Sequence, residues 1–228
     1  MKKRSKRYQQ LAKDHDGEAV VSIADAVKTL KGWASVKFDQ SVEVAMHLGI
    51  DARQADQIVR GAISLPHGIG KTLRVIAFCE GDEVAKAEAA GAIEVGGAEL
   101  VEKVQKGWLD FDVAIAHPRM MGQVGKLGRV LGPQGKMPSP KNGTVTPKVE
   151  AAVKDYVAGK VDFKNDALGN VQASVGKLSF DDNKLQDNIV DFVKTIKKLQ
   201  PTTLKGQFIK KVALSATMSP SVIVDTDL

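Results

Sequence analysis

Hydrophobic and polar residues follow two different patterns along this chain, and the first pattern occupies both of its ends. Residues 22–34 repeat apolar side chains at helical spacing, and Ser22 stands three residues before Asp25 as in a capping box, so this segment predicts a helix. Elsewhere at both ends apolar and polar residues alternate, which predicts half-buried strands joined by turns, with one further amphipathic helix. These elements are strands at 38–46, 60–65, 161–166, 169–180, 207–217 and 222–225, a helical turn at 52–58, a hairpin turn at Leu168 to Asn170, and a helix at 185–200.

The second pattern fills the middle of the chain, where the strands are uninterrupted apolar runs. The runs at 73–79, 92–97 and 111–118 lack alternation, and segments of helical periodicity separate them. Strands that are buried on both faces have this composition, and they occur in parallel sheets that helices cover on both sides. The expected helices are 82–91, 98–108 and 147–159, with a further helical segment at 120–131.

The two patterns divide the chain into two domains. We expect a discontinuous α+β domain, with an antiparallel or mixed sheet and helices, built from residues 1–67 and 161–228. An α/β domain with a Rossmann-like, three-layer architecture is inserted at 68–160. Because the chain crosses between them near residues 66–70 and again near Gly159, the two crossings form a double-stranded hinge.

Positive charge is concentrated in three stretches. The chain carries 33 bases and 27 acids, a net charge of +6, and residues 1–13, 119–148 and 192–224 each hold six bases and no acid. The remaining 15 bases face all 27 acids, so the rest of the chain is acidic. Basic faces on an acidic body are the electrostatic pattern of a nucleic-acid-binding protein.

The stretch 119–148 combines its bases with six glycines and four prolines. These residues make the backbone turn often, and large apolar side chains are few, so we expect a surface loop rather than a core element. Two interpretations stay open. The exposed amides and cations bind phosphates, or the stretch is a solvated loop that keeps the protein soluble.

No segment carries the motif of an enzyme, a nucleotide site or a metal site. HGIGKT at 67–72 resembles the end of a phosphate-binding loop, but Leu65 replaces the first glycine of that motif and a strand follows instead of a helix. G-x-S-x-G is absent, no G-x-G-x-x-G follows a strand, and the four histidines are too scattered for metal ligands. His117, at the end of a predicted strand, fits either a ligand site or a capping residue. We therefore expect no catalytic residue, no cofactor and no metal.

The single cysteine, Cys79, excludes an intrachain disulfide and fits a reducing compartment. It lies in the apolar run RVIAFC, where we expect a buried packing residue rather than a nucleophile. The basic N-terminus is not followed by the apolar segment of a secretory signal, and no apolar run reaches the length of a membrane span. These features predict a soluble, cytoplasmic protein.

Two short segments combine residue types that bind RNA. Lys37 and Phe38 place a cation beside an aromatic ring, which suits a phosphate and a stacked base, although Phe38 equally fits the first core residue of its strand. Lys211 shortly precedes LSATMSPS at 214–221, whose small hydroxyl side chains and adaptable methionine suit close contact with ribose 2′-hydroxyls.

Four blocks of the sequence resemble a known family. KLGRVLGPQGKMPSPKNGTVT at 126–146 is similar to the signature of the large-subunit ribosomal protein numbered one, the protein of the mobile ribosomal stalk. FDQSVEVAMHLGID, VRGAISLPHGIGK and SATMSPSVIVD match the other blocks of that family in order, so the resemblance covers essentially the whole chain. It implies a two-domain architecture and a protein that is not an enzyme.

The resemblance also implies partners and a binding surface. It implies binding to large-subunit ribosomal RNA, contact with deacylated transfer RNA leaving the exit site, and repression of the protein's own operon messenger RNA. It places the protein in the large ribosomal subunit, with no membrane partner and as a monomer outside the ribosome. The implied ribosomal-RNA-binding residues, on the domain built from both chain ends, are Lys37, Phe38, Glu43, Gly176, Lys177, Lys211, Ser215, Thr217 and Met218. The implied secondary RNA contacts, on the inserted domain, are Lys126, Arg129, Lys136 and Lys141.

Two blocks depart from the family pattern. The usual T-M-G-P has Ser219 in place of glycine, so a residue that permits close backbone approach is replaced by one with a side chain. The hairpin block, commonly K-x-G-x-x-H-A-x-I-G-K, begins with Ala167 and has Gln172 in place of histidine. Both changes bear on the strength of RNA contact, and on messenger repression more than on ribosome assembly.

Three hypotheses follow from the sequence. The first is a ribosomal RNA-binding protein whose two domains pivot. The second is a nucleotide-dependent enzyme that uses the inserted α/β domain. The third is a free-standing translational repressor.

Overall fold

The computed structural model describes residues 4–13, 17–204 and 206–225, and it divides into two compact units. The terminal unit comprises residues 1–70 and 161–228, and the inserted unit comprises residues 71–160. The first crossing falls after residue 70, where the sequence pattern places it after residue 67. The reason is Asn188 in helix α8 (Asp182–Lys198), which is fully buried and binds the backbone of both His67 and Gly68.

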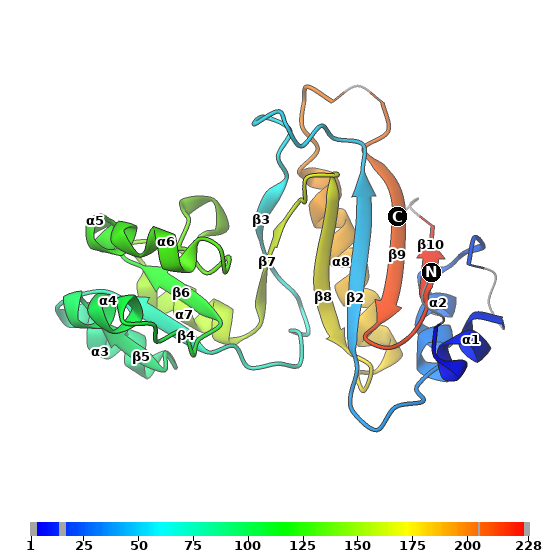
Figure 1. The fold of residues 1–228 in the computed structure, drawn as a ribbon, viewed down its shortest axis with the longest axis horizontal. Coiled ribbons are helices and arrows are strands. Elements are labelled where there is room, and N and C mark those ends of the chain that lie inside the picture. Colours follow the sequence, from blue (N-terminus) through cyan, green and yellow to red (C-terminus); the bar gives the residue numbers. More distant parts are fainter. Residues whose placement is uncertain (1–3, 14–16, 205, 226–228) are drawn as a thin grey trace. The chain divides into compact units, whose positions relative to one another are not determined.

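The terminal unit is built on a five-stranded sheet in the order β1-β10-β9-β2-β8 (Figure 1). Neighbouring strands are antiparallel except β1 and β10, which are parallel. A separate two-stranded sheet pairs β3 with β7. The strands of this unit are β1 (Val20–Val21), β2 (Ser41–Leu48), β3 (Arg60–Ser64), β7 (Lys160–Lys164), β8 (Asn170–Lys177), β9 (Ile209–Ala216) and β10 (Ser221–Val224).

Two amphipathic helices, α2 (Ile23–Gly32) and α8, pack against one face of the five-stranded sheet (Figure 1). The predicted cap of α2 is confirmed, because Ser22 Oγ accepts a hydrogen bond from the Asp25 amide at 3.2 Å. Alternate residues of β2, β8 and β9 are buried beneath the helices, as for Val44, Val175 and Leu214, which have no exposed surface. The residues between them face the other way, so the sheet has one open face.

Strand β2 begins at Ser41, so the predicted strand start at residue 38 is wrong. Phe38 precedes the strand and keeps 52% of its surface exposed, which excludes its interpretation as a first core residue. Residues 52–57 form turns and bends instead of the predicted helical turn.

Strands β7 and β8 do not form the predicted hairpin. Strand β7 pairs with β3 instead, and an isolated antiparallel bridge joins Asn165, which follows β7, to Val171 of β8. The turn itself lies at the predicted place, since the Asp166 carboxylate accepts hydrogen bonds from the amides of Leu168 and Asn170, each at 2.8 Å. Hydrogen bonds from Asn170, led by that of its side chain, hold the pKa of Asp166 below its ordinary value.

The inserted unit has three layers around a parallel sheet in the order β5-β4-β6. Its parallel direction is the one that the uninterrupted apolar runs predict. Helices α3 and α7 pack on one face of the sheet, and α4, α5 and α6 pack on the other. The elements are β4 (Val75–Phe78), α3 (Asp82–Ala89), β5 (Glu94–Gly96), α4 (Ala98–Gln105), β6 (Val113–Ala116), α5 (Met121–Val124), α6 (Gly128–Leu131) and α7 (Val149–Val157).

The basic stretch at 119–148 contributes to this core, so its prediction as a surface loop alone is wrong. Met120, Val124, Leu127 and Leu131 are at most 3% exposed and pack in one cluster with β4, α4 and β6. Their spacing of three and four residues is that of one helical face, which short α and 3₁₀ segments follow from residue 118 to residue 131. Within the described ranges, no helix combines the length and the apolar character needed to cross a bilayer.

Candidate nucleic-acid interface

The start of β2 and the ends of β8 and β9 meet at one end of the open face. Ser41 lies opposite Lys177 of β8, and Val42 lies opposite Ala216 of β9. The segment before β2 and the segment after β9 are therefore brought together, although they are far apart in the chain. We define the strand-end cluster as Lys37, Phe38, Ser41, Lys177, Thr217 and Met218.

The first residues of β2 hold this cluster in place. Ser41 Oγ accepts a hydrogen bond from Lys177 Nζ at 2.9 Å. The Ser41 amide donates to Thr217 Oγ1, and the Thr217 amide donates to the Ser41 carbonyl oxygen, both at 3.1 Å. Gln40 is only 1% exposed, and its Oε1 accepts from the Met218 amide at 2.9 Å. The backbone around Thr217 and Met218 is thus fixed against strand β2.

The outer surface of the cluster combines apolar and cationic groups. Phe38 and Met218 are 52% and 44% exposed, and Lys37, the residue before Phe38, is exposed as well. Large apolar side chains usually leave water on folding, so two on one surface point to a partner. An aromatic ring and a thioether next to ammonium groups suit bases and phosphates together.

The open face of the sheet continues from this cluster with small or polar side chains. Glu43 and Ser215 are paired across β2 and β9 at the end nearest to Ser41. His47 lies at the other end, with its Nδ1 2.8 Å from Asn170 Oδ1. The open face consists of Glu43, Ala45, His47, Asn170, Gln172, Ser174, Lys211, Ala213 and Ser215, all exposed or half-buried. The small side chains of Ala45, Ala213 and Ser215 leave room for a polynucleotide backbone among the longer polar ones.

Two of the residues expected to bind RNA, Lys211 and Gly176, lie outside the strand-end cluster. Lys211 lies opposite His47 and is separated from Ser215 by four positions along β9, about 13 Å in a strand. Gly176 is buried at a bulge in the pairing of β2 with β8. A Cβ atom there would lie 2.9 Å from Cδ2 of the buried Leu185 in α8, so the glycine allows this helix to approach the sheet.

Ser219, which stands where the family has glycine, turns its hydroxyl into the reversal between β9 and β10. Its Oγ accepts from the Ala216 amide at 3.0 Å and donates to a carbonyl oxygen of the same turn, with Pro220 O at 2.9 Å. Among the described residues, positive φ angles occur only at glycines, so the serine fits without backbone strain. The replacement therefore adds a side-chain hydrogen bond to the turn that carries Met218.

The four bases of the inserted unit that are expected to make secondary RNA contacts differ in their exposure to solvent. Lys126, Arg129 and Lys141 are exposed. Lys136 Nζ instead donates to the carbonyl oxygens of Leu109 and Phe111, at 3.0 and 2.7 Å. Its ammonium group is thus used within the fold. Three bases of the terminal runs, Lys2, Lys3 and Lys205, lie outside the described residues.

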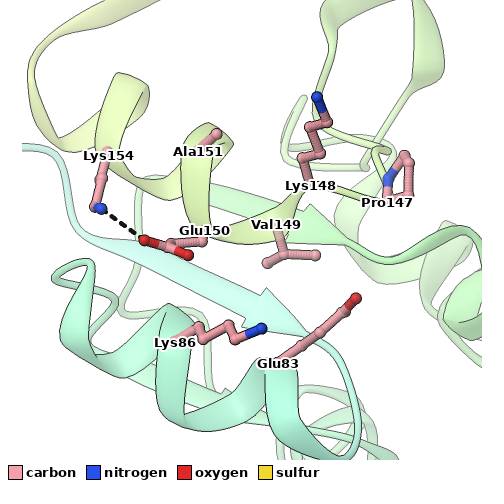
Figure 2. Close-up of a pocket in the computed structure, with 8 residues that line it drawn as sticks. All are labelled: Glu83, Lys86, Pro147, Lys148, Val149, Glu150, Ala151 and Lys154. Carbon is pink, nitrogen blue, oxygen red and sulfur yellow. Dashed lines mark hydrogen bonds and ion pairs between the residues drawn. The ribbon is translucent and has the colours of Figure 1, made fainter.

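Among the described residues of the inserted unit, charged side chains line two hollows. One follows the carboxyl ends of the strands, where His117 Nδ1 accepts from the Arg119 amide at 3.2 Å and caps a 3₁₀ turn, which confirms the capping interpretation. The other lies between α3 and the start of α7, where Figure 2 shows Lys154 paired with Glu150, at 2.6 Å. Acids and bases alternate along its walls. In the part of the chain that the structure describes, no three His, Cys, Asp or Glu side chains are placed to hold a metal ion.

Sequence reasoning did not identify three side chains that organise the cluster, Gln40, Ser41 and Arg7. Arg7 Nη2 donates to the Met218 carbonyl oxygen at 2.8 Å. The contacts of Gln40 and Arg7 with Met218 join positions that are 178 and 211 residues apart. Local patterns carry no signal for them. The small residues of the open face, by contrast, are visible as every second residue of each strand.

A polar, open sheet face that ends in exposed cations and an aromatic ring is characteristic of nucleic-acid-binding proteins. The chain belongs to the family described as Ribosomal protein L1p/L10e family, which it matches over residues 30–220. This match confirms the family identified from the sequence. Because the relatives are ribosomal proteins, it also confirms that the chain is not an enzyme and removes the hypothesis of a nucleotide-dependent enzyme.

Three similar proteins are each named large ribosomal subunit protein uL1. The protein of Saccharopolyspora erythraea is 51% identical over 225 residues, which cover 99% of this chain and 94% of that protein. The protein of Kosmotoga olearia is 50% identical over 225 residues, with 99% and 97% covered. The protein of Thermobifida fusca is 49% identical over 223 residues, with 98% and 95% covered.

Proposed function

We propose that this chain is a structural constituent of the large ribosomal subunit and binds large-subunit ribosomal RNA through the strand-end cluster and the adjoining open face. The observation that carries the proposal is that Gln40 and Ser41, shortly after the exposed Phe38, bind the Met218 amide and the Lys177 ammonium group at one end of the sheet. The names of the three relatives, all large ribosomal subunit proteins, support the same partner.

Each group of this surface has a chemical counterpart in folded RNA. The Lys177 ammonium group donates one hydrogen bond to Ser41 and has further protons for a phosphate oxygen. Phe38 and Met218 offer apolar contact to an unstacked base or a ribose. The exposed Glu43 carboxylate accepts hydrogen bonds from 2′-hydroxyl or exocyclic amino groups, which distinguishes RNA from a simple polyanion.

Within the ribosome, the protein forms the mobile stalk and assists the release of deacylated transfer RNA from the exit site. Two features support this role. The chain crosses between its two compact units only at residues 70–71 and 160–161, which suits a pivot. The inserted unit exposes Lys126, Arg129 and Lys141 for secondary RNA contacts.

A second role is repression of the protein's own operon messenger RNA through the same surface. The position of Ser219 supports it, because the serine hydroxyl is used inside its turn and leaves the cluster complete. Translation of the operon messenger in a purified system should fall when the free protein is added, and adding large-subunit ribosomal RNA should relieve the repression. Undiminished translation at saturating protein would reject this role.

Binding of Phe38→Ala and Met218→Ala variants to RNA tests the main proposal. Each variant should bind large-subunit ribosomal RNA about tenfold or more weakly, because one base contact of this kind is worth about 1–3 kcal/mol. Affinity for a random RNA of equal length should change little. The matched control is Leu168→Ala, which removes an apolar side chain that is 75% exposed in the turn before β8, at the other end of the sheet. Equal losses for both RNAs, or for the control, would reject the assigned surface.

A further inference from the structure

Helix α1 (Lys6–Lys13) contacts the strand-end cluster through one arginine. Arg7 Nη2 donates to the Met218 carbonyl oxygen at 2.8 Å, and Arg7 Nη1 donates to Ser35 Oγ at 3.1 Å. Ser35 belongs to the segment that leads to Phe38 and into β2. One guanidinium group therefore joins the segment that carries Phe38 to the turn that carries Met218.

Both backbone polar groups of Met218 are bound by side chains from distant segments. Its amide donates to Gln40 Oε1 at 2.9 Å, and its carbonyl oxygen accepts from Arg7 at 2.8 Å. The Met218 side chain nevertheless stays 44% exposed. The thioether is thus presented to solvent from a backbone that is held on two sides.

Helix α1 adds nothing to the hydrophobic core. None of its residues is buried, and only Arg7, Tyr8 and Leu11 are half-buried. The terminal unit therefore does not need this helix in order to bury its apolar residues. A change at Arg7 should alter the cluster without unfolding the unit, which makes the two effects separable by experiment.

The guanidinium group is suited to this double contact. Its nitrogen atoms are fixed in a planar fork, so two donors reach two acceptors at once, whereas a lysine ammonium group is a single point on a flexible stem. Side chains that are already held in their bound arrangement lose less conformational entropy when a partner arrives. Holding the segment that leads to Phe38 against the turn of Met218 therefore raises affinity for a partner that contacts both side chains.

We propose that Arg7, in helix α1, is a positioning residue of the RNA-binding surface; this inference rests on the function proposed above. Arg7 acts through Phe38 and Met218, which contact the RNA. Its own charge is directed to Met218 and Ser35 within the protein and is not a phosphate ligand. The partner is a folded RNA that touches both exposed side chains together.

Filter binding of large-subunit ribosomal RNA at several salt concentrations tests this inference. Arg7→Ala should weaken binding about tenfold, equal to about 1.4 kcal/mol, with an unchanged slope of log affinity against log salt. Arg7→Lys should recover part of the loss, since its ammonium group reaches one acceptor. Lys6→Ala removes an equal charge from the neighbouring exposed position, and it should weaken binding less than about threefold. All variants should keep the melting temperature of the unmodified protein.

Two results would overturn the inference. One is equal affinity of Arg7→Ala and Lys6→Ala. The other is a loss in Arg7→Ala accompanied by a slope shallower by about 0.7–0.9, which would identify Arg7 as a phosphate ligand. Phe38→Ala in the same series separates the two proposals. If Phe38→Ala also binds as tightly as the unmodified protein, the RNA surface itself is wrong; if it binds weakly while Arg7→Ala binds normally, only the role of Arg7 is wrong.

Discussion

Gly176 lies where β8 passes beneath α8, and it has a packing role besides the RNA contact that family resemblance implies. A Cβ atom would come within 2.9 Å of Leu185 Cδ2 and 3.2 Å of Phe180 Cδ2. Leu185 is fully buried and cannot move aside without disturbing the core. Packing against α8 therefore requires glycine at position 176. The adjacent Lys177 supplies a cation of the strand-end cluster.

Gly176→Ala should lower the free energy of unfolding by about 1–3 kcal/mol, the usual cost of overpacking a core. The matched control is Gly32→Ala in the same unit, since a Cβ atom at Gly32 meets nothing within 4 Å. That control should leave stability unchanged within about 0.5 kcal/mol or raise it slightly. Urea denaturation measures both variants. Equal stability of Gly176→Ala and the unmodified protein would contradict the packing role.

Cys79 is fully buried, as its apolar run predicts, and burial raises the pKa of its thiol to about 11, with Glu83 and Glu88 adding to the effect. At pH 8 only about one native molecule in a thousand carries the thiolate. Iodoacetamide should therefore modify the native protein at least about 100-fold more slowly than the urea-unfolded chain, as measured by mass spectrometry. Because the folded-state pKa is raised, this group stabilises the fold below pH 8.5, about its unfolded pKa, and the contribution falls as pH rises toward 11. Equal modification rates would show that the thiol is accessible.

At the scale of elements, the sequence predicts those features that depend on neighbouring residues. The capping box predicts α2, and uninterrupted apolar runs predict the parallel sheet of β4, β5 and β6. The partner of β7 was not predictable in this way, because alternation fixes which face of a strand is buried but not which strand lies beside it. The helical face at 120–131 was predicted as helical but not as core, since glycines separate its four apolar residues.

Lys136 links two elements of the inserted unit, because its ammonium group joins the basic stretch to the segment before β6. Lys136→Met keeps an apolar stem beside Phe111 but removes the donor to the carbonyl oxygens of Leu109 and Phe111. Stability should fall by about 1–3 kcal/mol, the cost of leaving such groups without a partner. Lys126→Met, at an exposed position of the same stretch, should change stability by less than about 0.5 kcal/mol. Hydrogen exchange of the β4 and β6 amides reports on this unit, and equal exchange in both variants would contradict the structural role.

At the scale of the whole molecule, the basic runs led no further than the terminal unit, whereas family resemblance named every residue of the strand-end cluster except Ser41. The basic run at 192–224 is divided between α8 and β9, so a run in the sequence is not one face in space. Lys37, Lys177 and Met218 become neighbours only through the pairing of β2 with β8 and β9. Their approach depends on strand register over more than a hundred residues, which no local pattern records.

Hydroxyl-radical footprinting of the protein, free and bound to large-subunit ribosomal RNA, tests where the RNA binds. Phe38 and Met218 report on the strand-end cluster, while the exposed Leu168 and Ile93 serve as internal controls in the turn before β8 and in the inserted unit. We expect RNA to reduce oxidation of Phe38 and Met218 several-fold and to leave the two controls unchanged. Protection confined to the inserted unit, with Phe38 and Met218 oxidised as in the free protein, would contradict binding through the strand-end cluster.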